Sequence, residues 1–295
     1  RQPRLKRERA SASEKGTEKV CATSCDMAFL LRLVSLAVAA SSVAGFTTGA
    51  ALPSRLARGT VTGICPRMGT IAVFGGGGGV GSEAVYQGLN NGDKVVTLVR
   101  DAAKVVIPPG SGGEAKAGQK LESPDLRVVV GDVKNAADVD SVFENGDVTG
   151  VVVALGGKTS EVGTTMLTDG TKNIIDSMQK KGVKRISLVT SIGANDSYDQ
   201  APFLFKVLMW TALKDQFADK NTQEDLLLKG PGSDLEYTIV RPSGLGKGPP
   251  TGSYKILPPD ADETAGSIER SDVAGFCLRV IKEDTYIGKA WSITG

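Results

Sequence analysis

The sequence predicts an α/β protein built on a doubly wound parallel sheet, in a single domain that covers residues 70–295. Three observations predict it. Short apolar runs alternate with helical segments from residue 70 onward, and strands buried on both faces that alternate with helices form parallel sheets. About 225 residues suit one such domain. The first apolar run passes directly into five consecutive glycines and then into a helical segment, which is the order of strand, tight turn and helix.

Each element is expected from the same alternation of apolar runs and amphipathic segments. Strands are predicted at 71–74, 94–99, 126–130, 150–155, 185–190, 235–240 and 286–294, and helices at 79–90, 136–144, 164–181, 202–229 and 271–281. Right-handed crossovers place the ligand cleft at the carboxyl ends of the strands, near the first strand. Residues 107–123 are polar and rich in glycine and proline, so a mobile surface insertion is expected there.

The glycine run after the first strand predicts a site for the diphosphate of a dinucleotide. Gly75, Gly78 and Gly81 give the spacing GxxGxxG, which is typical of Rossmann-type domains of the short-chain dehydrogenase kind. The first glycine permits the turn, the second lets the diphosphate approach the backbone, and the third lets the helix pack closely on the strand. Gly79 and Val80 begin the helix, whose N-terminus faces the anion. A flexible linker is disfavoured, because a linker does not connect a buried strand to an amphipathic helix. A plain structural turn is the remaining alternative.

The end of the second strand bears on the choice between NAD and NADP. An acid that closes this strand accepts hydrogen bonds from the ribose hydroxyls of NAD, whereas an arginine faces the additional 2′-phosphate of NADP. Here Arg100 comes first and Asp101 follows it, and Lys104 adds a second positive charge. NADP is therefore the expected cofactor and NAD the alternative. The structural alternative for Arg100 is a solvated residue at a strand end.

The ends of the third and fourth strands supply the remaining expected cofactor contacts. Asp132, followed by Val133, offers a carboxylate beside the adenine, unless it is the N-cap of the next helix. Small residues after the fourth strand let the ribose and the ring pass close to the backbone, or they form a plain turn. This second group is Ala154, Leu155 and Gly156.

The residues that follow the fifth strand bear on catalysis. Ser191 stands where short-chain dehydrogenases place the serine that hydrogen-bonds the substrate carbonyl. Those enzymes also carry Tyr-x-x-x-Lys, in which the lysine lowers the pKa of the tyrosine. None of the five tyrosines has a lysine four residues later, and the chain has no histidine. The candidate catalytic residues are therefore Ser191, Tyr198 and Lys220, and no metal site is expected. For Lys220, a solvated helix charge is the alternative.

The C-terminal region is expected to shape the substrate side of the cleft. Arg241 closes the sixth strand and is expected to form an internal ion pair with a carboxylate such as Asp272, because a partly buried arginine needs a partner charge. Residues 249–265 are expected to form a lid. Their single aromatic residue, Tyr254, and scattered charges do not identify a substrate.

Several segments together resemble the atypical short-chain dehydrogenase/reductases, of the NmrA-like and biliverdin-reductase-B-like kind. The matching segments are the glycine turn and residues 98–100, 131–132, 184–193, 220–224, 237–245 and 268–274. The resemblance implies an NAD(P)-binding Rossmann domain. It also implies that a lysine at the position of Lys220 approaches the nicotinamide ribose. Because such relatives include reductases, redox-sensing binders and plastid assembly factors, the resemblance is strong for the family and weak for the reaction.

The first 69 residues are expected to be a disordered leader. Residues 27–45 form an apolar run that ends in small residues, as in a signal peptide, and residues 46–67 are basic and free of acids, as in a transit peptide. The run is short and contains Arg32, so no permanent membrane span is expected. This order resembles the leaders of algae with secondary plastids and predicts import into a plastid. Secretion is the alternative, which the absence of a disulfide framework disfavours.

Two functions remain open at this stage. The first is an NADPH-dependent reductase of a small metabolite in the plastid, since nicotinamide supplies the hydride and the protein orients it. The second is a non-catalytic NADP(H)-binding redox sensor or a docking factor for a plastid complex, which the missing Tyr-x-x-x-Lys favours. A formal net charge of +2 gives no support to a nucleic-acid partner.

Overall fold

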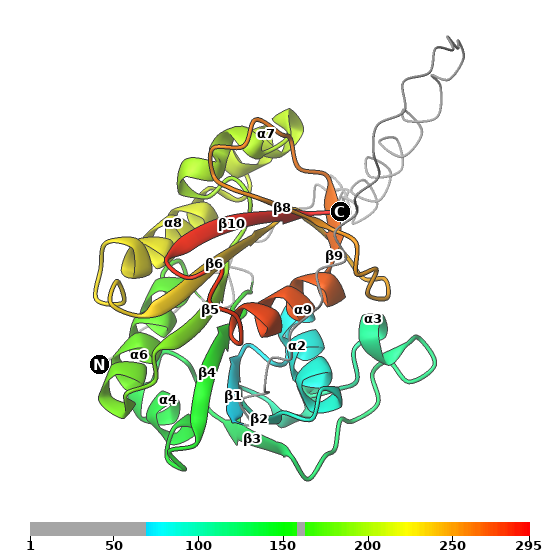
Figure 1. Cartoon of the computed structure of the whole chain (residues 1–295), viewed down its shortest axis with the longest axis vertical. Coiled ribbons are helices and arrows are strands. Elements are labelled where there is room, and N and C mark those ends of the chain that lie inside the picture. Colours follow the sequence, from blue (N-terminus) through cyan, green and yellow to red (C-terminus); the bar gives the residue numbers. More distant parts are fainter. Residues whose placement is uncertain (1–68, 158–162) are drawn as a thin grey trace, which may run out of the picture. The chain divides into compact units, whose positions relative to one another are not determined.

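The computed structural model describes residues 69–157 and 163–295, which form a sheet between two layers of helices (Figure 1). The predicted leader lies outside the described residues, except for Gly69. Within the described part of the chain, eight strands pair in the order β3-β2-β1-β4-β5-β6-β10-β8. All neighbouring pairs are parallel except β10 and β8. The predicted doubly wound α/β class is confirmed.

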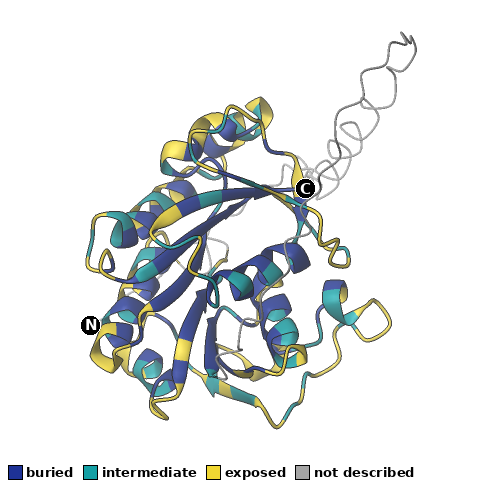
Figure 2. Cartoon of the chain, in the orientation of Figure 1, coloured by how far each residue is buried: buried dark blue, intermediate teal, exposed yellow. Residues whose placement is uncertain are grey.

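The strands of this sheet are short and mostly buried. Their bounds are β1 Thr70–Phe74, β2 Lys94–Val99, β3 Leu126–Val130, β4 Val148–Val153, β5 Arg185–Val189, β6 Glu236–Pro242, β8 Lys255–Leu257 and β10 Lys289–Thr294. A separate parallel pair, β7 Gly244–Gly246 with β9 Ser267–Glu269, follows β6 on the C-terminal side. Figure 2 shows the central strands mostly buried, with an exposed residue near the start of β4.

Helices cover both faces of the sheet because side chains in each strand alternate between the faces. Helices α2 Gly79–Asn90 and α9 Arg270–Val280 pack on the face to which Ile71 and Val73 point. On the opposite face, Ala72 and Phe74 join a second core with α4 Ala136–Val142, α6 Met166–Lys181 and α8 Lys214–Leu228. The remaining helical pieces are η1 Ala102–Lys104, α3 Pro109–Gly112, η2 Asn195–Gln200 and α7 Phe203–Trp210. None of the helices in the described residues has the length and apolar character that a bilayer crossing requires.

The predicted single helix over residues 202–229 is wrong. The chain forms α7 and α8, and the break is at Thr211, which leaves the helical region with φ −110° and ψ −90°. The two helices pack against each other through Met209 and Phe217, and the Phe205 and Phe217 rings meet edge to face with centroids 5.8 Å apart. Burial of these aromatic side chains favours a turn over a continuous helix.

The insertion over residues 107–123 is tied to the fold at its first half. The buried Glu83 carboxylate on α2 accepts hydrogen bonds from the backbone N–H groups of Gly110 and Ser111, at 3.0 and 2.9 Å. Gln87 also donates to the Ser111 hydroxyl at 2.8 Å. These contacts anchor α3 beside α2, and the mobility of the insertion stays a prediction.

Arg241 forms the expected internal ion pair, but the predicted partner is wrong. Its buried guanidinium donates to both carboxylate oxygens of Glu224 on α8, at 3.0 and 2.7 Å, and lies 2.6 Å from a carboxylate oxygen of Asp196. Burial lowers the pKa of Arg241, but the hydrogen bond and charge of Glu224, followed by Asp196, outweigh it and raise that pKa. Asp272 instead accepts hydrogen bonds from Thr251 and from the Gly252 N–H.

Replacing Arg241 with Met is expected to lower the free energy of unfolding by about 3–5 kcal/mol, because the Glu224 carboxylate stays buried without its cation. Urea denaturation measures the change. The control Lys180→Met removes the exposed pair with Asp140, whose atoms lie 3.4 Å apart, and is expected to cost less than about 1 kcal/mol. Equal losses in the two variants would show that the buried pair has no special role.

Candidate functional site

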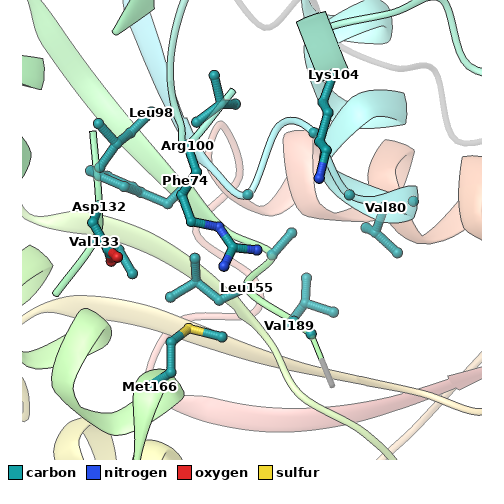
Figure 3. A pocket seen from close by; sticks show the side chains of 18 of the residues that line it. Phe74, Val80, Leu98, Arg100, Lys104, Asp132, Val133, Leu155, Met166 and Val189 are labelled. Carbon is teal, nitrogen blue, oxygen red and sulfur yellow. The ribbon is translucent and has the colours of Figure 1, made fainter. Parts of the chain in front are cut away.

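A cavity of about 540 Å³ lies at the carboxyl ends of the first five parallel strands (Figure 3). Residues that end or follow each of these strands line it: Gly75 after β1, Arg100 after β2, Asp132 after β3, Ala154 after β4 and Thr190 after β5. Open α/β sheets bind their ligands at this edge, where the strand order reverses. Here the reversal is at β1, since β2 lies on one side of it and β4 on the other.

The floor of the cavity is the glycine turn between β1 and α2. Gly75 has a φ of +95°, and a Cβ atom there would lie 2.3 Å from the Ala154 carbonyl oxygen. A Cβ at Gly81 would lie 2.0 Å from the Gly75 carbonyl oxygen. Only glycine allows this backbone path. The turn leaves the first N–H groups of α2 at the cavity, and these groups have no intrahelical acceptor.

The charge around the cavity is predominantly positive. Among the described residues that line it, the basic side chains are Arg100, Lys104, Lys134, Lys220 and Arg270, and the acidic ones are Asp101 and Asp132. Figure 3 shows the Arg100 and Lys104 side chains directed into the cavity. Together with the N-terminal dipole of α2, these cations suit a ligand with several phosphate groups.

Apolar side chains form the rest of the wall. Leu98, Val133, Leu155, Met166 and Val189 surround the cavity in Figure 3. An apolar wall beside a cationic floor suits a ligand that combines flat rings with phosphates. The cradle, the donors and the wall therefore fit a dinucleotide.

Ten of the eleven residues predicted for cofactor binding line this cavity. Gly81 does not line it, because its place is behind the turn, where it lets α2 approach β1. Asp132 does not cap the next helix. Asn135 is that N-cap, with its side-chain oxygen accepting from the Ala137 N–H at 3.1 Å.

Comparison with known proteins identifies the family. The family described as NAD(P)H-binding matches residues 75–284, which run from the glycine turn through α9. The chain belongs to the NAD(P)H-binding family. Residues 75–284 therefore belong to an NAD(P)-binding domain, and the predicted NAD(P)-binding Rossmann family is confirmed.

Individual members and similar structures agree with the family. An uncharacterized chloroplastic protein of Arabidopsis thaliana is 30% identical over 217 residues, which cover 72% of this chain and 72% of that protein. The anaerobillin reductase ChuY of Escherichia coli has a similar structure, with a TM-score of 0.58, 24% identity and coverage of 76% and 96%. A short-chain dehydrogenase/reductase of Veillonella parvula in complex with NADP gives a TM-score of 0.61 at 16% identity, with coverage of 77% and 94%. The two structures establish the fold alone.

Of the three predicted catalytic residues, Lys220 lines the cavity. It is half-buried on α8, and its Nζ donates to the Thr190 carbonyl oxygen at 3.1 Å. Burial lowers the pKa of Lys220 to about 8, although the charges of Glu224 and Asp219 raise it. The alternative of a solvated helix charge is wrong. An amine with this pKa exchanges a proton near neutral pH.

Ser191 and Tyr198 do not line the cavity. The Ser191 hydroxyl donates to the Ile192 carbonyl oxygen at 3.1 Å, where the chain leaves β5 and turns toward η2. Tyr198 lies in η2 with 37% of its surface exposed, and the Lys206 Nζ is 4.7 Å from its ring centroid. Their predicted roles therefore remain predictions.

Several cavity residues were not singled out from the sequence as candidate site residues. They include Lys134, Met166, Thr190, Leu245 and Arg270. Thr190, Leu245 and Arg270 stand in the segments 184–193, 237–245 and 268–274 that carry the family resemblance, and this was the available signal. Lys134 and Met166 reach the cavity after the end of β3 and on α6, which local sequence does not reveal.

Replacing Gly81 with Ala is expected to weaken NADPH binding by about 10-fold or more. The added Cβ overlaps the Gly75 carbonyl oxygen, so the turn must open. Fluorescence titration measures the affinity. The control is Gly244→Ala, where the nearest other atom lies 3.7 Å from the added Cβ, and it is expected to bind as the wild type does. Unchanged binding by Gly81→Ala would contradict the close approach of helix and strand.

Lys220 also predicts a pH dependence of stability. Since its folded-state pKa of about 8 lies below the ordinary lysine value of 10.5, the unfolded chain binds more protons between these values, and stability rises with pH across this window. Relative to Lys220→Met, the wild type is expected to be more stable at pH 9.5 than at pH 7. Urea denaturation at both values measures this. Lys214→Met, an exposed lysine on the same helix, corrects for the loss of one charge, and a pH-independent difference would refute the burial effect.

Proposed function

We propose that the protein is an NADPH-dependent reductase of a small metabolite in the plastid. One observation carries the proposal: a dinucleotide-sized cavity, whose charged side chains are predominantly basic, lies on the glycine turn of an NAD(P)-binding domain. In this proposal Gly75, Gly78 and Gly79 cradle the diphosphate, with the α2 N-terminus at Val80. Asp132 and Val133 lie at the adenine side, and Ala154, Leu155 and Gly156 pass beneath the ribose.

The preference for NADP rests on the end of β2. Arg100 is exposed and has no ion pair among the described residues, and Lys104 is exposed on the same rim. Asp101 is the competing residue, since an acid here would bind the ribose hydroxyls of NAD. Its Oδ1 instead accepts from the Ala103 N–H at 2.9 Å and caps η1. This engagement supports the guanidinium of Arg100 as the group that binds the 2′-phosphate.

The chemistry follows from the cofactor and from Lys220. A bound nicotinamide supplies the hydride. The Lys220 ammonium, held at the Thr190 carbonyl, keeps a positive charge and a transferable proton at the cavity. It is therefore assigned the stabilisation of negative charge that develops on the reduced group. Ser191, which follows the cavity residue Thr190, and Tyr198 are assigned to the substrate in this proposal.

The plastid location rests on two supports. The Arabidopsis relative is chloroplastic, and residues 27–67 have the composition of a signal peptide followed by a transit peptide. The reductase ChuY shares the fold, and a shared fold does not by itself identify the reaction.

The alternative is a non-catalytic sensor of NADP(H) or a docking factor for a plastid complex. A specific observation favours it: no tyrosine or histidine is among the described residues that line the cavity, so Lys220 stands without the usual proton donor. A protein that binds the nucleotide through the same groups and lacks this donor is suited to report the redox poise of the pool.

Titration with NADPH, followed by a screen for NADPH oxidation with quinones, flavins and tetrapyrroles, separates these functions. Turnover that Lys220→Met reduces supports the reductase. Tight binding without oxidation of NADPH by any acceptor supports the sensor. A purified full chain that binds neither NADPH nor NADH would refute both.

Replacing Arg100 with Ala is expected to weaken NADPH binding by about 10- to 100-fold while NADH binding stays within about 2-fold, since only NADPH carries the 2′-phosphate. Isothermal titration calorimetry measures both constants. The matched control is Lys94→Ala, an exposed cation at the opposite end of the same strand. Equal losses for the two nucleotides would exclude Arg100 as the residue that selects NADP.

A further inference from the structure

Arg270 lies directly against the glycine turn. It is the first residue of α9, and it lines the cavity at the turn between β1 and α2. A Cβ added to Gly79 would lie 2.7 Å from both Cδ and Nε of Arg270. The guanidinium end of this side chain therefore lies beside the first residue of α2, where the helix presents its unpaired N–H groups.

The positive charge of Arg270 has no partner acid among the described residues. Its Nη1 donates to the Gly246 carbonyl oxygen at 3.0 Å, and no ion pair accompanies this bond. The two nearest acids along the chain are engaged elsewhere: Glu269 accepts from the Gly248 N–H, and Asp272 accepts from Thr251 and Gly252. A half-buried guanidinium with one neutral acceptor keeps several N–H donors available for an anion.

The position distinguishes Arg270 from Arg100. Arg100 follows β2, whereas Arg270 adjoins Gly79 at the α2 N-terminus, which is the place of the diphosphate in the proposed function. Both nicotinamide nucleotides carry the diphosphate, and only one carries the 2′-phosphate.

We propose that Arg270 is a diphosphate-binding residue, which clamps either nicotinamide nucleotide onto the glycine turn from the α9 side. The proposal rests on the proposed nucleotide site. A guanidinium bonds two phosphate oxygens with parallel N–H groups. Arg270 therefore complements the backbone N–H groups of α2, and its bond to Gly246 sets the orientation of the guanidinium plane.

The test compares Arg270→Gln, Arg270→Lys and Arg100→Ala, with NADPH and NADH as ligands in calorimetric titrations of the full chain. Arg270→Gln is expected to weaken the binding of both nucleotides by the same factor, about 10- to 100-fold. Arg270→Lys keeps the charge but not the paired donors, and is expected to lose less binding affinity. Arg279→Gln, on the same helix but away from the cavity, is the matched control and is expected to bind as the wild type does.

The outcomes separate this inference from the proposed function. Wild-type affinity in a folded Arg270→Gln variant, as judged by circular dichroism, would refute the clamp while leaving the site intact. A loss confined to NADPH would also refute it, because Arg270 would then contact the 2′-phosphate. If Arg270→Gln fails to fold, Arg270→Lys decides: equal partial losses for both nucleotides support the clamp, and no loss refutes it. Absence of binding by the wild type would refute the proposed function itself.

Discussion

The buried carboxylate of Glu224 is the constraint on which the position of Lys220 in the site depends. It accepts hydrogen bonds from Arg241, from the Thr190 hydroxyl at 2.6 Å and from the Asn195 side chain at 2.9 Å. These bonds join α8 to the ends of β5 and β6. A buried carboxylate is stable only when such partners compensate its lost hydration. The same network fixes the Thr190 carbonyl to which Lys220 donates, so the position of the amine follows from a structural ion pair.

The parts of the site that follow from local sequence were predictable. A strand that ends in GxxGxxG and enters a helix has few alternatives, because the backbone path demands glycine at Gly75 and close packing demands it at Gly81. The residues that follow each strand can also be predicted from local sequence. Parallel strands buried on both faces place the residues after them at one edge, which brings Arg100, Asp132 and Ala154 together although they are far apart in the chain.

The parts that depend on distant packing were not predictable. Nothing in the sequence near Arg241 indicates that its partner, Glu224, lies on α8. The sequence also does not show that the Asp272 carboxylate accepts a hydrogen bond from the Thr251 N–H instead. The division between α7 and α8 likewise follows from aromatic packing that helical periodicity does not encode. Arg270 lies 191 residues from Gly79 in sequence, and only the pairing of α2 with α9 brings them together.

One buried side chain constrains how redox state can reach this domain. Cys277 on α9 is the single cysteine of the described residues, and burial raises the pKa of its thiol to about 12. A protonated, enclosed thiol neither attacks disulfides nor forms sulfenic acid readily. Thioredoxin-like reductants and peroxide are therefore not expected to react with Cys277 in the folded protein. In the proposed function, the described residues would respond to redox conditions through the oxidation state of the bound nicotinamide rather than through this thiol.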